Sequence, residues 1–327
     1  MGATHFISVD FETIKFQPPI TKWPAKSFPD VMYTPRNDPY YEEKAVPLID
    51  AAKYSGVELW IWAIDRHVKT TMRTNIIRSL KNFTNTRSLF RWLMSWPGQA
   101  TQVSILIYFA ALVESGIKRD SLMKREKDYD TILYNLRQIL ITRDMPRLKR
   151  KIVFNICVVC SHGSGIFDQL IMNGVIHTKD FIWDSQLRYY WHNHQLKIKC
   201  FNTIYDYGYE YLGICQRLMT TPLTERCFLT ITQALRYVLG AKLIGTTGSG
   251  KSETIRDLAK ASAILLFGFS CSNLIDYSNL TAFMKGTACT GSWTCLDDFD
   301  RISPGLISVI AQLFGEICQA LKKKSFT

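Results

Sequence analysis

The sequence predicts a long α-helical segment followed by an α/β module that binds phosphate, and three observations support this fold class. Apolar residues recur at helical spacing between Val57 and Cys160. A glycine-rich loop, Gly245–Ser252, lies between a short apolar run and a helical pattern. A second short apolar run, Trp293–Leu296, is followed directly by two carboxylates. This order of elements is typical of phosphate-loop nucleotide-binding folds.

Composition indicates a folded, globular chain. Of its 327 residues, 47% are apolar and 21% are charged, and 40 basic against 28 acidic residues give a net charge of +12. No basic-then-apolar leader opens the sequence, and Phe6 stands where a myristoylation motif needs Ser or Thr. Nearly unbroken apolar runs such as Ile152–Cys160 are too short to span a bilayer. We therefore expect neither secretion nor a membrane partner.

The first 54 residues are predicted to be irregular, because prolines crowd positions 18–47 and block long helices. One short strand is expected at Phe6–Val9. Helical patterning begins at Val57 and is broken by Trp96-Pro97-Gly98-Gln99. Further helices are expected at Val103–Ile117, Tyr129–Ile141 and Leu148–Cys160, and a single strand is expected at Leu196–Tyr205.

The basic charge is concentrated in Lys118–Lys151, which carries 11 basic and 5 acidic residues. Such a stretch can attract nucleic acid. However, Leu133, Leu136 and Ile139 recur at helical spacing, and the stretch lacks interleaved aromatics of the kind that a single-strand binder would use. We favour an amphipathic helix with a solvated basic face, and we expect no DNA or RNA partner.

Nine cysteines are scattered along the chain, an odd number that suggests reduced thiols and a cytoplasmic setting. Cys157-Val-Val-Cys160 has the spacing of metal ligands, but no second pair accompanies it. Because this pair lies in an apolar run, we predict two buried thiols rather than a zinc or redox site.

The phosphate loop carries the strongest chemical signal. Gly245-Thr246-Thr247-Gly248-Ser249-Gly250-Lys251-Ser252 fits the pattern G-x-x-x-x-G-K-[ST]. Glycines let successive backbone N–H groups face one anion, and the N-terminus of the following helix favours negative charge. Lys251 is expected to reach the β- and γ-phosphates of a nucleotide, and the Ser252 hydroxyl to bind Mg²⁺. A strand at Ala241–Ile244 is expected to lead into the loop.

A second acidic site is expected near the loop, 46 residues beyond Lys251. The run Trp293–Leu296 is predicted to be a strand whose end presents Asp297 to the metal and Asp298 to the attacking water. The alternative is an ordinary acidic cap or solvated turn. Ile264–Ser270 is predicted to be an intervening strand, and Ser303-Pro304 to start a helix.

These motifs resemble those of dynein heavy chains. Gly248–Lys260 is similar to the Walker A loop and helix of their first AAA+ module, and Cys295–Ile302 is similar to its Walker B segment. Thr221–Cys227 resembles the segment beside the adenine. Trp96–Gln99, Ser185–Trp191 and Tyr207–Gly213 resemble parts of the linker and of its junction with the ring. The sequences of Glu253–Lys260 and Cys271–Tyr277 resemble those of axonemal dyneins more than those of cytoplasmic dyneins.

The resemblance implies a helical linker segment at residues 55–205 and a truncated AAA+ ATPase module at residues 206–327. It implies that the module binds ATP with Mg²⁺, with Leu223 packed against adenine. It also implies that a complete motor couples hydrolysis to linker movement along microtubules. Implied partners are microtubules and the intermediate and light chains, and the implied location is the cytoskeleton of a cilium or flagellum, in the axoneme.

Two positions depart from the family pattern. The family has Glu where this chain has Asp298, and the shorter side chain loses about 1.5 Å of reach toward the attacking water. Hydrolysis is therefore expected to suffer more than binding. Thr246-Thr247 replaces Pro-Ala within the loop, a milder change because these positions contribute mainly backbone.

Two other functions remain open from the sequence. A truncated fragment could bind dynein partners without turning over ATP. An unrelated phosphate-loop enzyme is disfavoured, because no substrate-side constellation of His, Cys or carboxylate stands out. A truncated sheet leaves an open edge and an uncovered apolar face, so poor solubility or dependence on a partner is expected.

Overall fold

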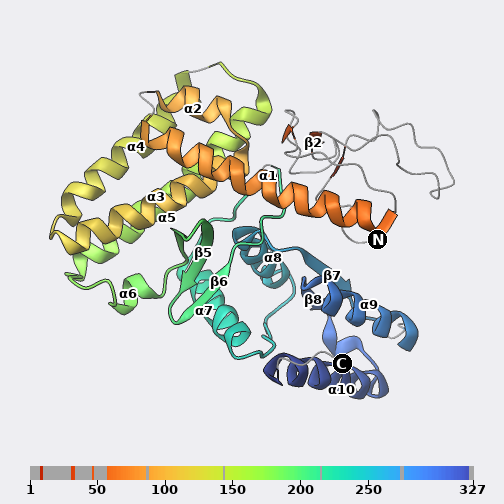
Figure 1. The fold of residues 1–327 in the computed structure, drawn as a ribbon. Helices are drawn as coiled ribbons and strands as arrows, with labels where there is room; N and C mark the ends of the chain where they lie inside the picture. Colours follow the sequence, from red (N-terminus) through yellow and green to blue (C-terminus); the bar gives the residue numbers. More distant parts are fainter. Residues whose placement is uncertain are drawn as a thin grey trace. The chain divides into compact units, whose positions relative to one another are not determined.

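A computed structural model describes residues 8–9, 31–33, 46–47, 57–85, 88–142, 144–213, 216–272 and 276–323. The chain divides into two compact units, Met1–Thr220 and Thr221–Thr327, called unit 1 and unit 2 below (Figure 1). The predicted boundary between residues 205 and 206 lies near the end of a strand, β6 (Thr203–Asp206), and remains a prediction.

The segment that was expected to be irregular lies almost entirely outside the described residues. Within it, three short strands form an antiparallel sheet in the order β1-β2-β3: β1 (Ser8–Val9), β2 (Val31–Tyr33) and β3 (Val46–Pro47). Part of the strand expected at Phe6–Val9 is therefore present as β1.

Helices make up most of the part of unit 1 that the structure describes, as the sequence predicted. They are α1 (Val57–Asn85), α2 (Leu89–Ser95), α3 (Gly98–Lys118), α4 (Leu122–Thr142), α5 (Arg147–Met172) and the short α6 (Phe181–Asp184). The predicted break is confirmed, because Trp96 ends α2 and Pro97 is the N-cap of α3. Each helix extends beyond the apolar run that predicted it, because polar residues continue the same hydrogen-bonded turns.

The core of unit 1 is centred on α3, which packs against α1, α4 and α5 (Figure 1). Phe109 on α3, Tyr129 on α4 and Phe167 on α5 meet with ring centroids 5.2–5.6 Å apart. Gly163 lets α5 approach α4, because a Cβ there would lie 2.6 Å from the Tyr129 hydroxyl oxygen. This apolar cluster therefore joins α2, α3, α4 and α5, and Phe83 of α1 packs against it.

The predictions for the basic helix and for the cysteine pair are confirmed. Leu133, Leu136 and Ile139 of α4 are buried, while most of its basic residues are exposed. Cys157 and Cys160 are buried free thiols on α5. Burial raises the pKa of Cys157 to about 11 and that of Cys160 to about 12, so both stay protonated at neutral pH.

A three-stranded antiparallel sheet follows these helices: β4 (Arg188–His192), β5 (Gln195–Cys200) and β6. The prediction of one strand over Leu196–Tyr205 was wrong, because the chain reverses at Phe201 and Asn202. Phe201 has a left-handed φ of 51°, and Cys200 then pairs with Thr203 across the turn. Apolar alternation continues through such a tight turn, so the pattern could not reveal it.

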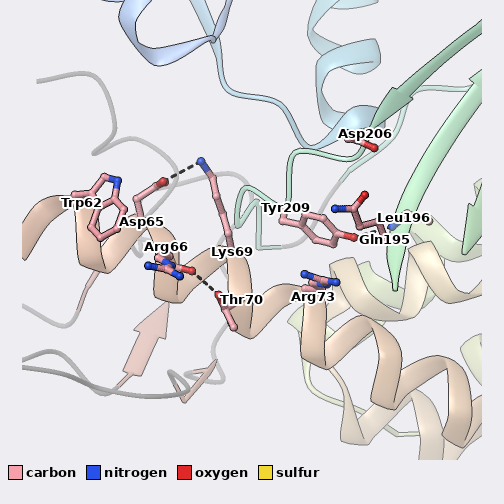
Figure 2. A pocket seen from close by; sticks show the side chains of 10 residues that line it. All are labelled: Trp62, Asp65, Arg66, Lys69, Thr70, Arg73, Gln195, Leu196, Asp206 and Tyr209. Carbon is pink, nitrogen blue, oxygen red and sulfur yellow. Dashed lines mark hydrogen bonds and ion pairs between the residues drawn. The ribbon is translucent and has the colours of Figure 1, made fainter. Parts of the chain in front are cut away.

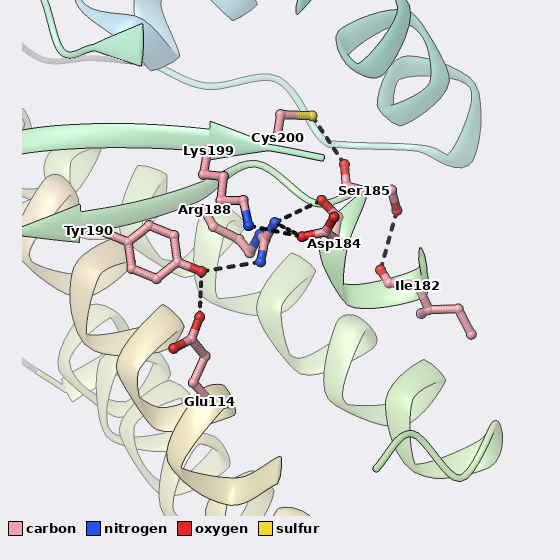
Figure 3. Close-up of polar contacts among 8 residues, drawn as sticks. All are labelled: Glu114, Ile182, Asp184, Ser185, Arg188, Tyr190, Lys199 and Cys200. Atoms are coloured by element: carbon pink, nitrogen blue, oxygen red, sulfur yellow. Dashed lines mark hydrogen bonds and ion pairs between the residues drawn. The ribbon is translucent and has the colours of Figure 1, made fainter. Parts of the chain in front are cut away.

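Buried polar contacts fasten this sheet to the helices (Figure 3). Arg188, 3% exposed, forms an ion pair and hydrogen bond with Asp184 of α6, and Lys199 reaches the same carboxylate at 3.3 Å. The Tyr190 hydroxyl donates to Glu114 of α3 at 2.6 Å. Because these charges are buried and paired, loss of one partner would leave another unsatisfied.

Unit 2 contains a β-α-β unit with helices around it. Its elements are α7 (Pro222–Arg236), α8 (Lys251–Ser262), β7 (Leu266–Ser270), α9 (Tyr277–Thr290), β8 (Trp293–Asp297) and α10 (Pro304–Lys323). Strands β7 and β8 are parallel, with Phe267 opposite Thr294 and Ser270 opposite Asp297. A crossover helix is what parallel strands require, and α9 supplies it. The strands predicted at Ile264–Ser270 and Trp293–Leu296 and the helix predicted after Ser303 are confirmed.

One predicted element of unit 2 is absent. Ala241–Ile244 is described but is not a strand, and Ile244 is 84% exposed. A strand needs a hydrogen-bonded neighbour, and β7 and β8, the strands described in this unit, pair with each other. Ala241–Ile244 therefore has the apolar composition of a strand but pairs with neither of the strands described in unit 2.

By length and composition alone, two of the described helices could cross a membrane: α3 and residues 304–321 of α10. The sequence analysis considered only nearly unbroken apolar runs, so it did not single out these two helices. In α3, 72% of the candidate window is buried, which is typical of a core helix, whereas in α10 only 6% is buried. The α10 window therefore presents an extensive apolar surface.

Candidate nucleotide-binding site

The phosphate loop adopts the backbone conformation that its glycines allow. Gly248 and Gly250 both have φ of 81°, in the left-handed region that L-residues rarely adopt. Gly250 is the N-cap of α8, so Lys251 is the first residue of that helix. The helix N-terminus, with its partial positive charge, therefore opens directly onto the loop.

The Lys251 ammonium lies against the loop itself. Its Nζ donates hydrogen bonds to the carbonyl oxygens of Gly245 at 2.9 Å and Thr246 at 2.7 Å. The Ser249 hydroxyl donates to the same Thr246 oxygen at 2.8 Å. These contacts hold Lys251, Ser249 and the two ends of the loop together around an exposed surface. Lys251 must exchange its carbonyl partners to reach a bound phosphate.

The serine that follows Lys251 meets the acidic end of β8. Ser252 Oγ donates a hydrogen bond of 2.5 Å to Asp297 Oδ1, although the two residues are 45 positions apart in the chain. Asp297 is held from its backbone as well, because its carbonyl oxygen accepts from Cys271 N at 2.9 Å. The two residues predicted to bind metal therefore lie in direct contact.

This pair offers the ligands that Mg²⁺ prefers. A hydroxyl and a carboxylate are hard oxygen donors, and Mg²⁺ bound by one or two protein ligands keeps waters and substrate phosphates as the others. No group of three or more His, Cys, Asp or Glu residues suited to a metal occurs among the described residues. The donor set therefore fits a metal held jointly by the protein and a nucleotide, rather than a closed protein cage.

Arg256 was missed by the sequence analysis, although it lies one helical turn beyond Ser252. Its guanidinium contacts Glu253 Oε1 at 2.5 Å and lies 3.9 Å from Asp297 Oδ2. The i, i+4 spacing from Ser252 puts both side chains on one face of α8, and this spacing could have identified Arg256. Arg256 places a positive charge beside the carboxylate of Asp297.

Asp298, the residue predicted to activate water, lies differently from Asp297. It has a left-handed φ of 53° and precedes a 3₁₀ turn at Phe299–Arg301. Its exposed carboxylate lies 3.8 Å from Arg301 Nη1. Adjacent carboxylates thus have separate partners, Ser252 for Asp297 and Arg301 for Asp298.

The predicted adenine contact lies at the start of α7. Thr221 caps this helix through a reciprocal capping box with Thr224, and Pro222 occupies the first turn. Leu223, in the same turn, is 70% exposed. The structure describes no contact between Leu223 and the phosphate loop.

A phosphate loop at the start of a helix, with its serine bonded to an aspartate at the end of a parallel strand, defines the class of phosphate-loop nucleotide-binding modules. Residues 207–327 match the family described as the hydrolytic ATP binding site of the dynein motor region. The chain belongs to the dynein heavy-chain family, as a fragment that includes part of this motor region.

The similarity to individual relatives extends beyond the motor-region match. The chain is 35% identical to human Dynein axonemal heavy chain 1 over 272 residues, or 83% of this chain and 6% of that protein. It is 33% identical to mouse Dynein axonemal heavy chain 2 over 270 residues, or 81% of this chain and 6% of that protein. The chain thus spans a small fraction of the length of these relatives.

Proposed function

We propose that unit 2 binds ATP with Mg²⁺ at the phosphate loop and the end of β8. The observation that carries the proposal is the contact between Ser252 and Asp297, which joins the loop to the acidic strand end. Ser252 and Asp297 are 45 residues apart in sequence, so the fold rather than local chain geometry brings them into contact. A hydroxyl and a carboxylate in contact can bind one Mg²⁺ ion together.

The residues of unit 2 would act in distinct ways. Backbone N–H groups of Gly245–Gly250 and the N-terminus of α8 would bind the phosphates, and Lys251 would neutralise the β- and γ-phosphates. Ser252 and Asp297 would hold Mg²⁺, which screens the charge that develops on the phosphates. Asp298 would orient the attacking water, and Leu223 would cover the adenine.

We further propose that, in a complete heavy chain, ATP turnover here is coupled to movement of residues 55–205 as a linker. Microtubules and the dynein intermediate and light chains would then be partners of the whole motor. An axonemal location in a cilium or flagellum is supported by the names of the relatives, which are axonemal dynein heavy chains.

A second candidate function is that of an interaction fragment that binds dynein partners without ATP turnover. This second candidate is favoured by Asp298, because its side chain is shorter than that of Glu and its exposed carboxylate lies beside Arg301. An ion pair with Arg301 draws that carboxylate away from the role of general base. Turnover, rather than nucleotide affinity, therefore separates the two candidates.

The metal role of Asp297 can be tested with a fluorescent ATP analogue titrated into the chain with and without Mg²⁺. We expect Mg²⁺ to tighten binding by about tenfold or more, and Asp297→Asn to remove most of that gain. The exposed Asp300, three residues further on, supplies the control Asp300→Asn, which should behave as wild type. Equal responses to Mg²⁺ in wild type and Asp297→Asn would refute the proposed site.

A further inference from the structure

Unit 1 contains a pocket of about 330 Å³ between α1 and the β4-β5-β6 sheet (Figure 2). Its lining residues are remote in sequence from the phosphate loop. From α1 come Trp62, Arg66, Lys69 and Arg73, spaced by four, three and four residues, so they form a stripe along one helical face. Gln195, Leu196, Asp206 and Tyr209 line the opposite side. An aromatic and basic stripe therefore faces a partly apolar wall.

Two of the three cations in this stripe have no carboxylate partner among the described residues. Lys69 is neutralised, because it pairs with Asp65 at 2.9 Å and with the buried Glu210 at 3.0 Å. Arg73 donates to the backbone carbonyl of His194, and Arg66 lies over the Trp62 ring at 5.3 Å from its centroid. Both guanidinium groups are thus oriented by uncharged partners and keep donors available for an anion.

The pocket also presents apolar surface that the core does not use. Trp62 is 56% exposed, although a large aromatic side chain is usually covered by other residues. Tyr209 is held in place across the pocket, where its hydroxyl oxygen accepts from Leu196 N at 2.8 Å. An apolar side chain of a ligand would bury the exposed face of Trp62 against this fixed wall.

We propose that this pocket binds an acidic peptide segment of a partner protein. Two carboxylates of the peptide would engage Arg66 and Arg73, and an apolar residue beyond the carboxylate at Arg66 would contact Trp62. The two arginines are seven residues apart on α1, a rise of about 10.5 Å. Side chains of an extended peptide alternate between two faces, so acidic residues on one face lie about 6.7 Å apart when one residue separates them and about 13 Å apart when three residues do. The second of these spacings is the nearer to the separation of the two arginines.

The same lining argues against a nucleic acid. Asp65 and Asp206 lie among the lining residues, and a continuous row of phosphates would meet both carboxylates. A peptide can place its negative charges beside the arginines and neutral residues beside the aspartates. Electrostatic complementarity of this kind selects partners by their pattern of charge rather than by total charge.

The test uses the full chain and fluorescein-labelled 12-residue peptides with two Glu residues separated by one to six positions and a Leu two positions outside one of them. By anisotropy, we expect saturable binding that is strongest when three residues separate the two Glu residues, because both side chains then lie on one face. Matched Gln peptides should bind about tenfold or more weakly. Arg66→Gln and Arg73→Gln should each weaken the Glu peptide by a similar factor.

The exposed Arg78, further along α1 and outside the pocket lining, supplies the matched control Arg78→Gln, which should leave binding unchanged. Lys251→Ala should also bind the peptide normally, which separates this result from failure of the nucleotide site. No binding of any Glu peptide, or an equal loss in Arg78→Gln, would overturn the proposal. So would tighter binding of a 12-nucleotide RNA that depends on Arg66 and Arg73.

Discussion

At the scale of single residues, the proposed hydrolysis of ATP depends on Asp298. Its carboxylate is one methylene shorter than the glutamate of the family pattern and lies beside Arg301. General-base catalysis depends on reach to the reacting water, so a small loss of reach costs rate while phosphate binding is kept. Binding and turnover should therefore respond separately to substitutions at this position.

We predict that Asp298→Glu raises the single-turnover rate of ATP hydrolysis by about tenfold or more, with little change in ATP affinity. The longer side chain would restore reach toward the γ-phosphate and free the carboxylate from Arg301. Radiolabelled ATP in a quench experiment measures the rate, and Asp300→Glu serves as the control. An unchanged rate in Asp298→Glu despite normal ATP binding would favour the interaction fragment.

The half-buried His162 on α5 predicts that unit 1 loses stability in mild acid. Burial, aided by the Arg217 guanidinium, lowers the pKa of His162 from 6.5 to about 4. As the pH falls, the His162 imidazole is therefore protonated near pH 6.5 in the unfolded chain but only near pH 4 in the folded chain. Stability present above pH 6.5 is lost as the pH falls between these values, by about 2 kcal/mol for a partly solvated group.

Urea unfolding of wild type and His162→Gln at pH 7 and pH 4.5 isolates this contribution. The variant should lose less free energy of unfolding on acidification than wild type does, because it lacks the titrating imidazole. Equal losses in the two proteins would show that His162 is not held neutral by the fold.

At the scale of elements, Gln99 joins the start of α3 to the segment 207–212 that follows β6. Its Nε2 donates to the Tyr207 hydroxyl and to the Glu210 carbonyl, both at 2.8 Å, and its Oε1 accepts from Leu212 N at 2.9 Å. Gln99 is 1% exposed, so water cannot replace these bonds. The side chain thus fixes the last part of unit 1 to its helical core.

We predict that Gln99→Leu destabilises unit 1 by about 3 kcal/mol, because it removes three buried hydrogen bonds. Gln99→Glu, which keeps the acceptor for Leu212 N but loses the donors, should also be destabilising. Urea unfolding followed by tryptophan fluorescence reports the change. A loss below about 0.5 kcal/mol in Gln99→Leu would mean that the anchor is not structural.

The elements show what the sequence could and could not predict. Helices followed from apolar spacing, and the break at Pro97 followed from a residue that ends helices. The turn at Phe201 and the unpaired Ala241–Ile244 depend on which segments meet in space, which one-dimensional patterning does not contain. For the same reason, the motifs predicted that Ser252 and Asp297 bind metal, but the hydrogen bond between them and the approach of Arg256 became known only from the structure.

At the scale of the whole molecule, unit 2 carries an apolar surface that its small core does not cover. Its buried cluster contains Cys271, Leu280, Ile302 and Ile310, with a few partly buried neighbours. On α10, Ile307, Phe314 and Leu321 are each more than a third exposed and recur every seven residues. Such a stripe on one helical face promotes association.

We predict that replacing Ile307, Phe314 and Leu321 together by Gln reduces self-association of the chain without lowering its free energy of unfolding by more than about 1 kcal/mol. Sedimentation velocity at several concentrations measures association. The contrasting variant Ile310→Gln, at a buried position of the same helix, should instead destabilise unit 2. Association that persists unchanged in the triple variant would mean that another surface drives it.

The most direct test of the account is a calorimetric titration of the chain with Mg·ATP, alongside Lys251→Ala and the exposed-lysine control Lys285→Ala. We predict that wild type and Lys285→Ala bind Mg·ATP saturably at one site per chain. The affinity of Lys251→Ala for Mg·ATP should be at least about a hundredfold weaker, since a charge-assisted phosphate contact is lost. Absence of binding by a folded wild type, or equal affinity in Lys251→Ala, would contradict the claim that this loop binds ATP.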